Sequence, residues 1–187
     1  MDEKTNQLTY AVLACLFAAL ISIGAFIAVP VPGSPVPIVM QNMFIMLAAL
    51  VLGPWWALLS TVIYLLFGLL GMPVFSGGSG GIAKLLGPTG GYLFGYIPAV
   101  ILMGLISAKG GKRTLTNLLA CVMGMAIVYL FGVLRLKSVL QADWNRALTA
   151  GLYPFIPGDL IKIVLASILA PRLSSGMDAL LNRDNDA

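Results

Sequence analysis

The fold is decided by the first apolar stretch of the chain, which reads LTYAVLACLFAALISIGAFIAV over residues 8–29. This stretch carries no charged side chain, and it is long enough for a transmembrane helix, which needs about 20 apolar residues. The rest of the 187-residue chain has the same character, because 59% of all residues are hydrophobic and only 10% are charged. Soluble domains carry about 25% charged residues, so this chain lacks the polar side chains to cover a surface in water. The sequence therefore predicts an all-α integral membrane protein.

Five more apolar segments follow the first, separated by polar or Gly/Pro-rich breaks. The six predicted transmembrane helices cover residues 8–29, 36–52, 55–70, 90–108, 115–134 and 157–173. We expect them to form one compact six-helix transmembrane domain over residues 1–187. The second, third and sixth segments are at or just under the lower length limit of about 17 residues, so a re-entrant segment is the alternative to six full spans.

The connections between these segments differ in length, which predicts the two faces of the domain. Residues 53–54 and 109–114 form short connections on the face that holds both termini, whereas the long connections 30–35, 71–89 and 135–155 share the opposite face. The face with the termini carries the cations Lys4, Lys109, Lys112, Arg113, Arg172 and Arg183, and the opposite face carries Lys84, Arg135, Lys137 and Arg146. This positive bias predicts that both termini are cytoplasmic.

The long connection 71–89 mixes apolar side chains with closely spaced glycines. We expect it to form a flexible apolar lid over a cavity, because long connections in compact folds are often lids or binding loops. The alternative is a loop that only plugs the helix ends. Its glycines do not form a phosphate-binding loop, since Ala83 precedes Lys84 and Leu85 follows it. We therefore expect that transport by this chain draws its energy from a partner or a gradient.

The ionisable residues exclude several classes of protein. The chain has no histidine, and its only glutamate is Glu3 in the N-terminal tail. These absences exclude His-dependent catalytic triads, His-ligated metals and paired-glutamate catalysis. The two cysteines, Cys15 and Cys121, lie in apolar runs and are too few for a disulfide framework. We expect no enzyme activity, no metal or other cofactor and no nucleic-acid binding, since the net charge of +4 reflects orientation in the membrane.

The segment PGDLIK at residues 157–162 contains the sharpest ionisable feature. Asp159 and Lys162 are three residues apart and share one helix face, and Lys162 lies one turn deeper in an apolar segment. An ionisable residue at that depth usually faces a cavity and has a function, so we interpret the pair as a ligand site. The alternatives are a self-neutralising pair and a helix-dipole interaction of Asp159. Gln41 and Asn42, on the same predicted side, either complete the site or meet interfacial water.

The predicted first helix carries small residues at a four-residue spacing, which lets another helix approach closely in lipid. They form two faces, Ala11–Cys15–Ala19 and Ala14–Ala18–Ser22. Two such faces on one helix favour contact with an external protein partner. Packing within this chain is the alternative for either face.

Two motifs, LGPTGGYL at residues 86–93 and PGDLIK at residues 157–162, add to the six short helices and the small-residue first helix. In combination, these features resemble the BioY family over essentially the whole chain. The resemblance implies the substrate-binding component of an energy-coupling factor (ECF) transporter, which captures biotin outside the cell and delivers it to the cytoplasm. It implies a membrane coupling protein and two cytoplasmic ATPases as partners. It also implies that Ala14, Ala18 and Ser22 contact the coupling protein.

The chemistry of biotin suits the candidate site. Its ureido ring offers two N–H donors that a carboxylate such as Asp159 can accept, and Lys162 can donate to a carbonyl or carboxylate oxygen. The expected apolar and aromatic walls are Phe75, Leu86, Tyr92 and Tyr96. Lys84 matches no motif of the family, and we include it in the ligand site on local chemistry alone. Tyr92, Tyr96 and Tyr129 each fit a core or membrane-interface position as well as a ligand contact.

Several other functions compete with biotin capture. The nearest is a substrate-binding component for a different vitamin. A carrier or channel that works alone is a second, although it should show internal repeats and none is evident in the two halves of the sequence. A membrane enzyme would have to depend on Asp143, Asp159 and a few hydroxyls, and a scaffold without a ligand would not explain a buried Lys162.

Overall fold

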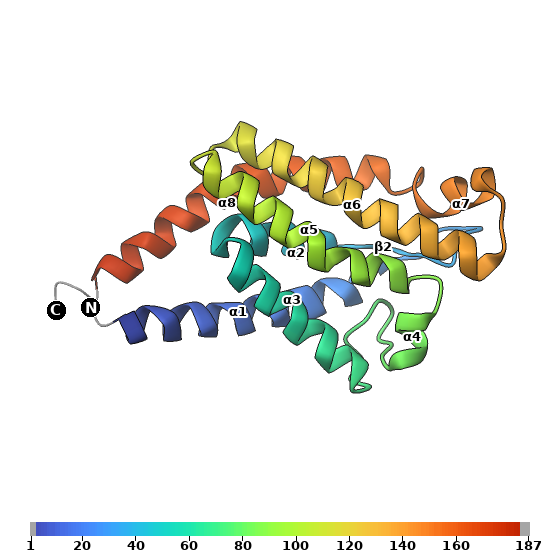
Figure 1. Ribbon diagram of the computed structural model, residues 1–187, viewed down its shortest axis with the longest axis horizontal. Helices are drawn as coiled ribbons and strands as arrows, with labels where there is room; N and C mark the ends of the chain where they lie inside the picture. The colour runs from blue at the N-terminus through green and yellow to red at the C-terminus, as the bar shows by residue number, and fades with distance from the viewer. Residues whose placement is uncertain (1–2, 184–187) are drawn as a thin grey trace.

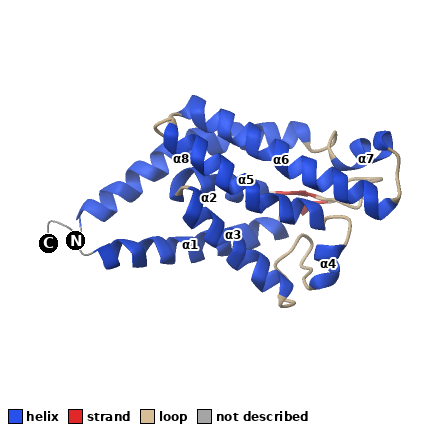
Figure 2. Ribbon diagram, viewed as in Figure 1, coloured by secondary structure: helices blue, strands red, loops and turns tan. Residues whose placement is uncertain are grey.

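The computed structural model describes the backbone of residues 3–183 and the side chains of residues 6–177. Figure 1 shows an elongated helical bundle, and Figure 2 shows that nearly all of it is helix. Four helices are long and apolar enough to cross a membrane: α1 (Glu3–Phe26), α5 (Gly90–Lys109), α6 (Thr114–Leu140) and α8 (Ile156–Arg183). Two shorter apolar helices are α2 (Gln41–Leu52) and α3 (Pro54–Leu69). The prediction of an all-helical membrane protein is therefore confirmed.

Helix α2 is the centre of the bundle. Every residue from Ile45 to Leu52 is buried, and α2 contacts α1, α3, α5 and α8. A helix that is apolar on all sides is buried either in protein or in lipid, and α2 is buried in protein. Its 12 residues span about 18 Å, which is shorter than the hydrocarbon core of a bilayer.

The predicted helix at 36–52 begins five residues later than expected, at Gln41. The preceding residues are extended, because prolines at positions 35 and 37 lack the backbone N–H groups of a helix. Strand β2 (Ile38–Val39) pairs with strand β1 (Ala28–Val29) in a two-stranded antiparallel ribbon. Extended backbone at membrane depth is tolerated where protein surrounds it or where it lines a cavity. Residues 38–39 of the ribbon form part of the wall of a cavity at the N-terminal end of α2.

Helices α5 and α6 form the most extensive helix–helix contact of the bundle. Gly91 and Gly95 of α5 allow this close approach, since a Cβ atom on Gly91 would lie 2.3 Å from the backbone oxygen of Phe131. Small residues four apart are typical of close helix packing in membranes. Helix α6 continues to Leu140, six residues past its predicted end. The prediction ended the helix where the apolar run stops, but Arg135 and Lys137 are part of the helix.

The two ends of the bundle differ as the lengths of the connections predict. Figure 1 shows the start of α1 and the end of α8 at one end of the molecule, and the long connections at the other. Two of those connections contain short helices that the sequence did not predict, α4 (Ile82–Leu86) and α7 (Trp144–Gly151). Asp143 caps α7 by accepting a hydrogen bond from the backbone N–H of Arg146 at 3.1 Å. Of the cations that predicted the orientation, the side chains of Lys4 and Arg183 lie outside the described residues.

Candidate ligand-binding site

The site is built around an ion pair in the first turns of α8. Lys162 Nζ lies 2.8 Å from Asp159 Oδ1, and both side chains are buried. Lys162 Nζ also donates a hydrogen bond of 2.7 Å to the backbone oxygen of Val39. That oxygen is available because Val39 lies in the extended ribbon and not in a helix. The extended segment before α2 therefore holds the lysine in place from the opposite side of the site.

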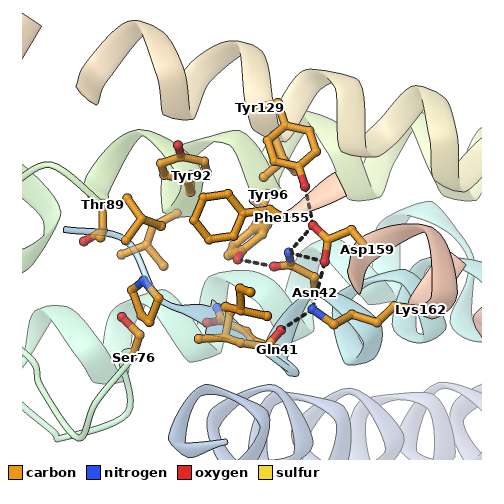
Figure 3. A pocket seen from close by; sticks show the side chains of 16 residues that line it. Gln41, Asn42, Ser76, Thr89, Tyr92, Tyr96, Tyr129, Phe155, Asp159 and Lys162 are labelled. Carbon is orange, nitrogen blue, oxygen red and sulfur yellow. Dashed lines mark hydrogen bonds and ion pairs between the residues drawn. The ribbon is translucent and has the colours of Figure 1, made fainter. Parts of the chain in front are cut away.

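Helices α6 and α2 contact the Asp159 carboxylate directly, and α5 supports it through Asn42 (Figure 3). Tyr129 of α6 donates its hydroxyl hydrogen to Oδ2, and Asn42 Nδ2 of α2 donates to Oδ2 at 3.1 Å and Oδ1 at 3.4 Å. Tyr96 of α5 donates to Asn42 Oδ1 at 2.7 Å, which fixes the orientation of the amide. The pair is therefore more than a self-neutralising contact within α8, because a network from α2, α5 and α6 positions the carboxylate.

This network forms one end of a cavity of about 50 Å³. Its lining consists of Val36, Pro37, Ile38, Val39, Gln41, Asn42, Ser76, Thr89, Tyr92, Leu93, Tyr96, Val128, Tyr129, Phe155, Asp159 and Lys162. Figure 3 shows Ser76 and Thr89 at the opposite end from Asp159 and Lys162. The cavity thus has a charged end, aromatic walls and a hydroxyl-bearing end, which suits a small ligand with polar groups at both ends.

Two polar groups in the lining make no hydrogen bond to the described residues. They are the side-chain amide nitrogen of Gln41 and the hydroxyl of Thr89, and both side chains are buried. A buried polar group without a partner costs about 1–3 kcal/mol. A ligand that accepts from Gln41 or bonds to Thr89 recovers this cost, so these groups are suited to ligand recognition.

Tyr92 forms an aromatic wall whose position is fixed by glycines. A Cβ atom on Gly132 would lie 2.2 Å from the Tyr92 ring, so only glycine leaves room for the ring there. The Tyr92 hydroxyl donates a hydrogen bond of 2.7 Å to the backbone oxygen of Gly151 at the end of α7. Because this hydroxyl is used for the fold, Tyr92 offers its ring to a ligand.

Six of the nine predicted ligand residues line the cavity: Gln41, Asn42, Tyr92, Tyr96, Asp159 and Lys162. The structure does not bring Phe75, Lys84 and Leu86 into the lining.

Phe75 packs on α3 instead, edge-on to the ring of Tyr64 with ring centroids 5.5 Å apart, and it anchors the lid connection. Leu86 is 57% exposed on α4. Lys84 is half-buried on the same helix, and this burial lowers the pKa of its amine from the ordinary value.

The small-residue faces of α1 also differ from the expectation. Ala14 and Ala18 are 0% and 4% exposed in the core of the chain, and Ser22 donates its hydroxyl hydrogen to the backbone oxygen of Ala18. The Ala14–Ala18 face is therefore used for packing within this chain, against α2 and α3. Cys15 and Ala19, on the second face, are exposed.

Several lining residues were not predicted from the sequence. They are the stretch 36–39, Ser76, Thr89, Leu93, Val128 and Phe155, and Tyr129 was left open between ligand contact and core. A signal existed for Thr89, which is the polar residue of the Gly-Pro-Thr-Gly-Gly-Tyr motif, and for Phe155, which lies just before Pro157. Among the residues whose side chains are described, no cluster of His, Cys, Asp or Glu could hold a metal ion.

Both the sequence and the fold are similar to those of known proteins. A model described as the BioY family matches residues 1–179. The chain is 45% identical over 161 residues to a "Probable biotin transporter BioY" from Pyrococcus horikoshii, covering 86% of this chain and 93% of the relative. It is 42% identical to the "Biotin transporter BioY" of Thermotoga maritima, covering 86% and 92%. A crystal structure of the S-component for biotin from an ECF-type ABC transporter superposes with a TM-score of 0.87 at 31% identity, covering 94% of this chain and 95% of that one.

Proposed function

Because the chain belongs to the BioY family of biotin transporters, we propose that it captures biotin as the substrate-binding component of an ECF-type transporter. The observation that carries this proposal is the cavity with the Asp159–Lys162 pair at one end. Membership of a transporter family also agrees with the expectation that the chain is not an enzyme. Biotin is the substrate named for the relatives and for the similar solved structure.

The ureido ring of biotin lies at the charged end of the cavity. Asp159 has about four acceptor positions on its two oxygens, and it can exchange the Asn42 bond for the ureido N–H groups. Lys162 then donates to the ureido oxygen. The valerate carboxylate points away from Asp159, because two carboxylates side by side repel each other. It lies toward Thr89 and Ser76, and the Gln41 amide adds a donor along the cavity.

The cavity must widen to admit this ligand. Sites for molecules of this size are typically about 300–1,000 Å³, whereas the cavity holds about 50 Å³. The lid connection 71–89 supplies Ser76 to the lining, and the stretch 36–39 supplies a second wall. Neither is part of a long helix, so both can move without breaking the bundle. Outward movement of these two segments admits biotin, and they close over it around a wider cavity.

Biotin capture is tested most simply by a panel of vitamins. The purified chain is incubated with each vitamin, and the midpoint of thermal unfolding is measured, since a ligand that binds the folded state raises this midpoint. We expect biotin to raise it and thiamine, riboflavin and folate to leave it unchanged. A rise with a different vitamin would reassign the substrate, and no rise with any of them would contradict the binding function.

Helix α6 holds the lid connection through Arg135. Its guanidinium donates to the backbone oxygen of Leu86 in α4, so this side chain links the end of the lid to the bundle. Arg135→Gln shortens the side chain and removes this link. We expect the variant to release bound biotin several times faster than the unmodified chain, measured by stopped-flow exchange of labelled biotin. Lys137→Gln, two residues away on the same helix, is the control, and equal rates in all three proteins would contradict the role of Arg135.

The chain crosses the membrane six times in this proposal, with both termini in the cytoplasm. Helices α2 and α3 are the two spans that join the four longer ones. Helix α2 is short, and the extended residues around β2 make up for the length that it lacks. The positive bias of Lys109, Lys112 and Arg113 at the α5–α6 turn supports the orientation. Energy for release comes from a membrane coupling protein and two cytoplasmic ATPases, as the ECF-type context of the similar structure supports.

The exposed small residues Cys15 and Ala19 of α1 are the part of this helix that suits the coupling protein. A helix of the partner can approach closely only where side chains are small. We expect Ala19→Leu to reduce co-purification of the coupling protein while leaving biotin binding unchanged. Leu8→Ala, on the exposed first part of α1, is the control. Full co-purification with Ala19→Leu would show that this face is not the contact.

A further inference from the structure

A second, larger hollow lies on the outside of the bundle. It is an apolar groove of about 510 Å³ between α6, α7 and α8, and it is distinct from the ligand cavity. Along α6 the groove runs from Val122 to Leu134, a helix length of about 18 Å. Leu148 of α7 and Leu160 of α8 form its other walls. Its length suits a single extended hydrocarbon chain.

The groove faces lipid, not water. Val122, Leu130, Leu134 and Leu160 are each more than two-fifths exposed, and they lie on helices long and apolar enough to span a membrane. An apolar hollow of this kind stays dry, and an unfilled one forfeits the dispersion contacts of its lining. An acyl chain of the bilayer fills such a groove without breaking any hydrogen bond.

One end of the groove carries a positive charge. Trp144 of α7 lines the groove, and Lys137 Nζ lies 4.9 Å from the centre of its ring. In the part of the chain whose side chains are described, the one ion pair is Lys162–Asp159, so the Lys137 ammonium has no carboxylate partner. Asp143 is nearby in sequence but accepts from the backbone N–H of Arg146. A tryptophan with an adjacent lysine is typical of the headgroup level of a membrane, where lysine attracts anionic lipids.

From these observations we propose that the groove binds one acyl chain of an anionic phospholipid, with the lipid phosphate against Lys137 and Trp144. The bound chain has a consequence for the ligand site. Tyr129 and Asp159 line both the groove and the ligand cavity, so they form the wall between the two. The acyl chain covers the outer side of this wall, next to the carboxylate that biotin contacts.

The location of the lipid is tested by fluorescence quenching. The full chain with Trp55→Phe and Trp56→Phe retains Trp144 as its single tryptophan. It is reconstituted into vesicles in which a fixed fraction of the lipid carries brominated acyl chains, which quench nearby tryptophan. We expect brominated phosphatidylglycerol to quench Trp144 more strongly than brominated phosphatidylcholine, by about fivefold in relative affinity, the factor that one lysine near an anionic surface provides.

Two variants in this background separate the two parts of the proposal. Ala126→Phe fills the groove at an exposed position, and we expect it to abolish the excess quenching. Lys137→Gln should make the two lipids quench equally while the acyl chain still binds. Ala108→Phe, at an exposed position of α5 outside the groove, should leave the excess unchanged. Equal quenching by both lipids in the parent protein, or an excess that survives Ala126→Phe, would overturn the proposal. Covering of Trp144 by a second copy of the chain would overturn it too, since neither lipid would then quench.

Discussion

Replacing Asp159 by asparagine is expected to weaken biotin binding by about tenfold or more. The carboxylate accepts from Lys162, Tyr129 and Asn42 in the buried site, and it can exchange one of these donors for the ureido N–H groups. An asparagine at this position offers one acceptor oxygen in place of two and carries no negative charge. Hydrogen bonds to a charged group contribute about 1.5–3 kcal/mol, which corresponds to the expected loss of affinity. Isothermal titration calorimetry of the purified chain with biotin measures it.

The control for this variant is Asp143→Asn. Asp143 is exposed and caps α7, and asparagine is about as good a helix cap as aspartate. Affinity should therefore be unchanged in this control. An Asp159→Asn chain that binds biotin as tightly as the unmodified chain would remove Asp159 from the site.

Replacing Lys162 by methionine is expected to have the largest effect on stability. The substitution leaves the Asp159 carboxylate buried without its cation, and breaking a buried pair in this way costs about 3–5 kcal/mol. It also removes the hydrogen bond to the Val39 backbone oxygen, which holds the extended wall of the cavity. We expect a clear fall in the midpoint of thermal unfolding and loss of biotin binding. Lys109→Met, at the exposed end of α5, should change neither.

The double variant Asp159→Asn with Lys162→Met separates stability from binding. It removes both charges, so no uncompensated charge stays buried, and much of the lost stability should return. Biotin binding should not return, because both ligand contacts are gone. A double variant that binds biotin normally would show that the pair serves the fold and not the ligand.

The sequence was sufficient to predict the main helices and the residues at the charged end of the cavity. An aspartate and a lysine at a spacing of three in an otherwise apolar segment stand out because ionisable groups are costly in a membrane. The structure shows the pair buried, with Asn42 and Tyr96 in the same network. A chain with few charged residues makes this kind of prediction easier, since nearly all its other charges lie near helix ends or in connections.

The sequence could not predict features that depend on which face of a segment turns inward. The four-residue spacing on α1 identifies two close-packing faces but does not say which one meets a helix of the same chain, and Ala14 and Ala18 proved to be internal. The sequence also does not predict the path of the lid connection through the bundle. Phe75 is held by α3, so that Ser76 and not Phe75 reaches the cavity. Contacts of this kind arise from tertiary packing, for which local sequence contains no signal.

A structure of the chain with biotin bound is the most direct test of the claim that the cavity at the Asp159–Lys162 pair is the biotin site. We predict density for the ureido ring within hydrogen-bonding distance of Asp159 and Lys162, with the valerate directed toward Thr89 and with the segments 36–39 and 71–89 displaced outward. Biotin bound elsewhere, for example in the groove beside α7, with the pair unchanged, would contradict the claim.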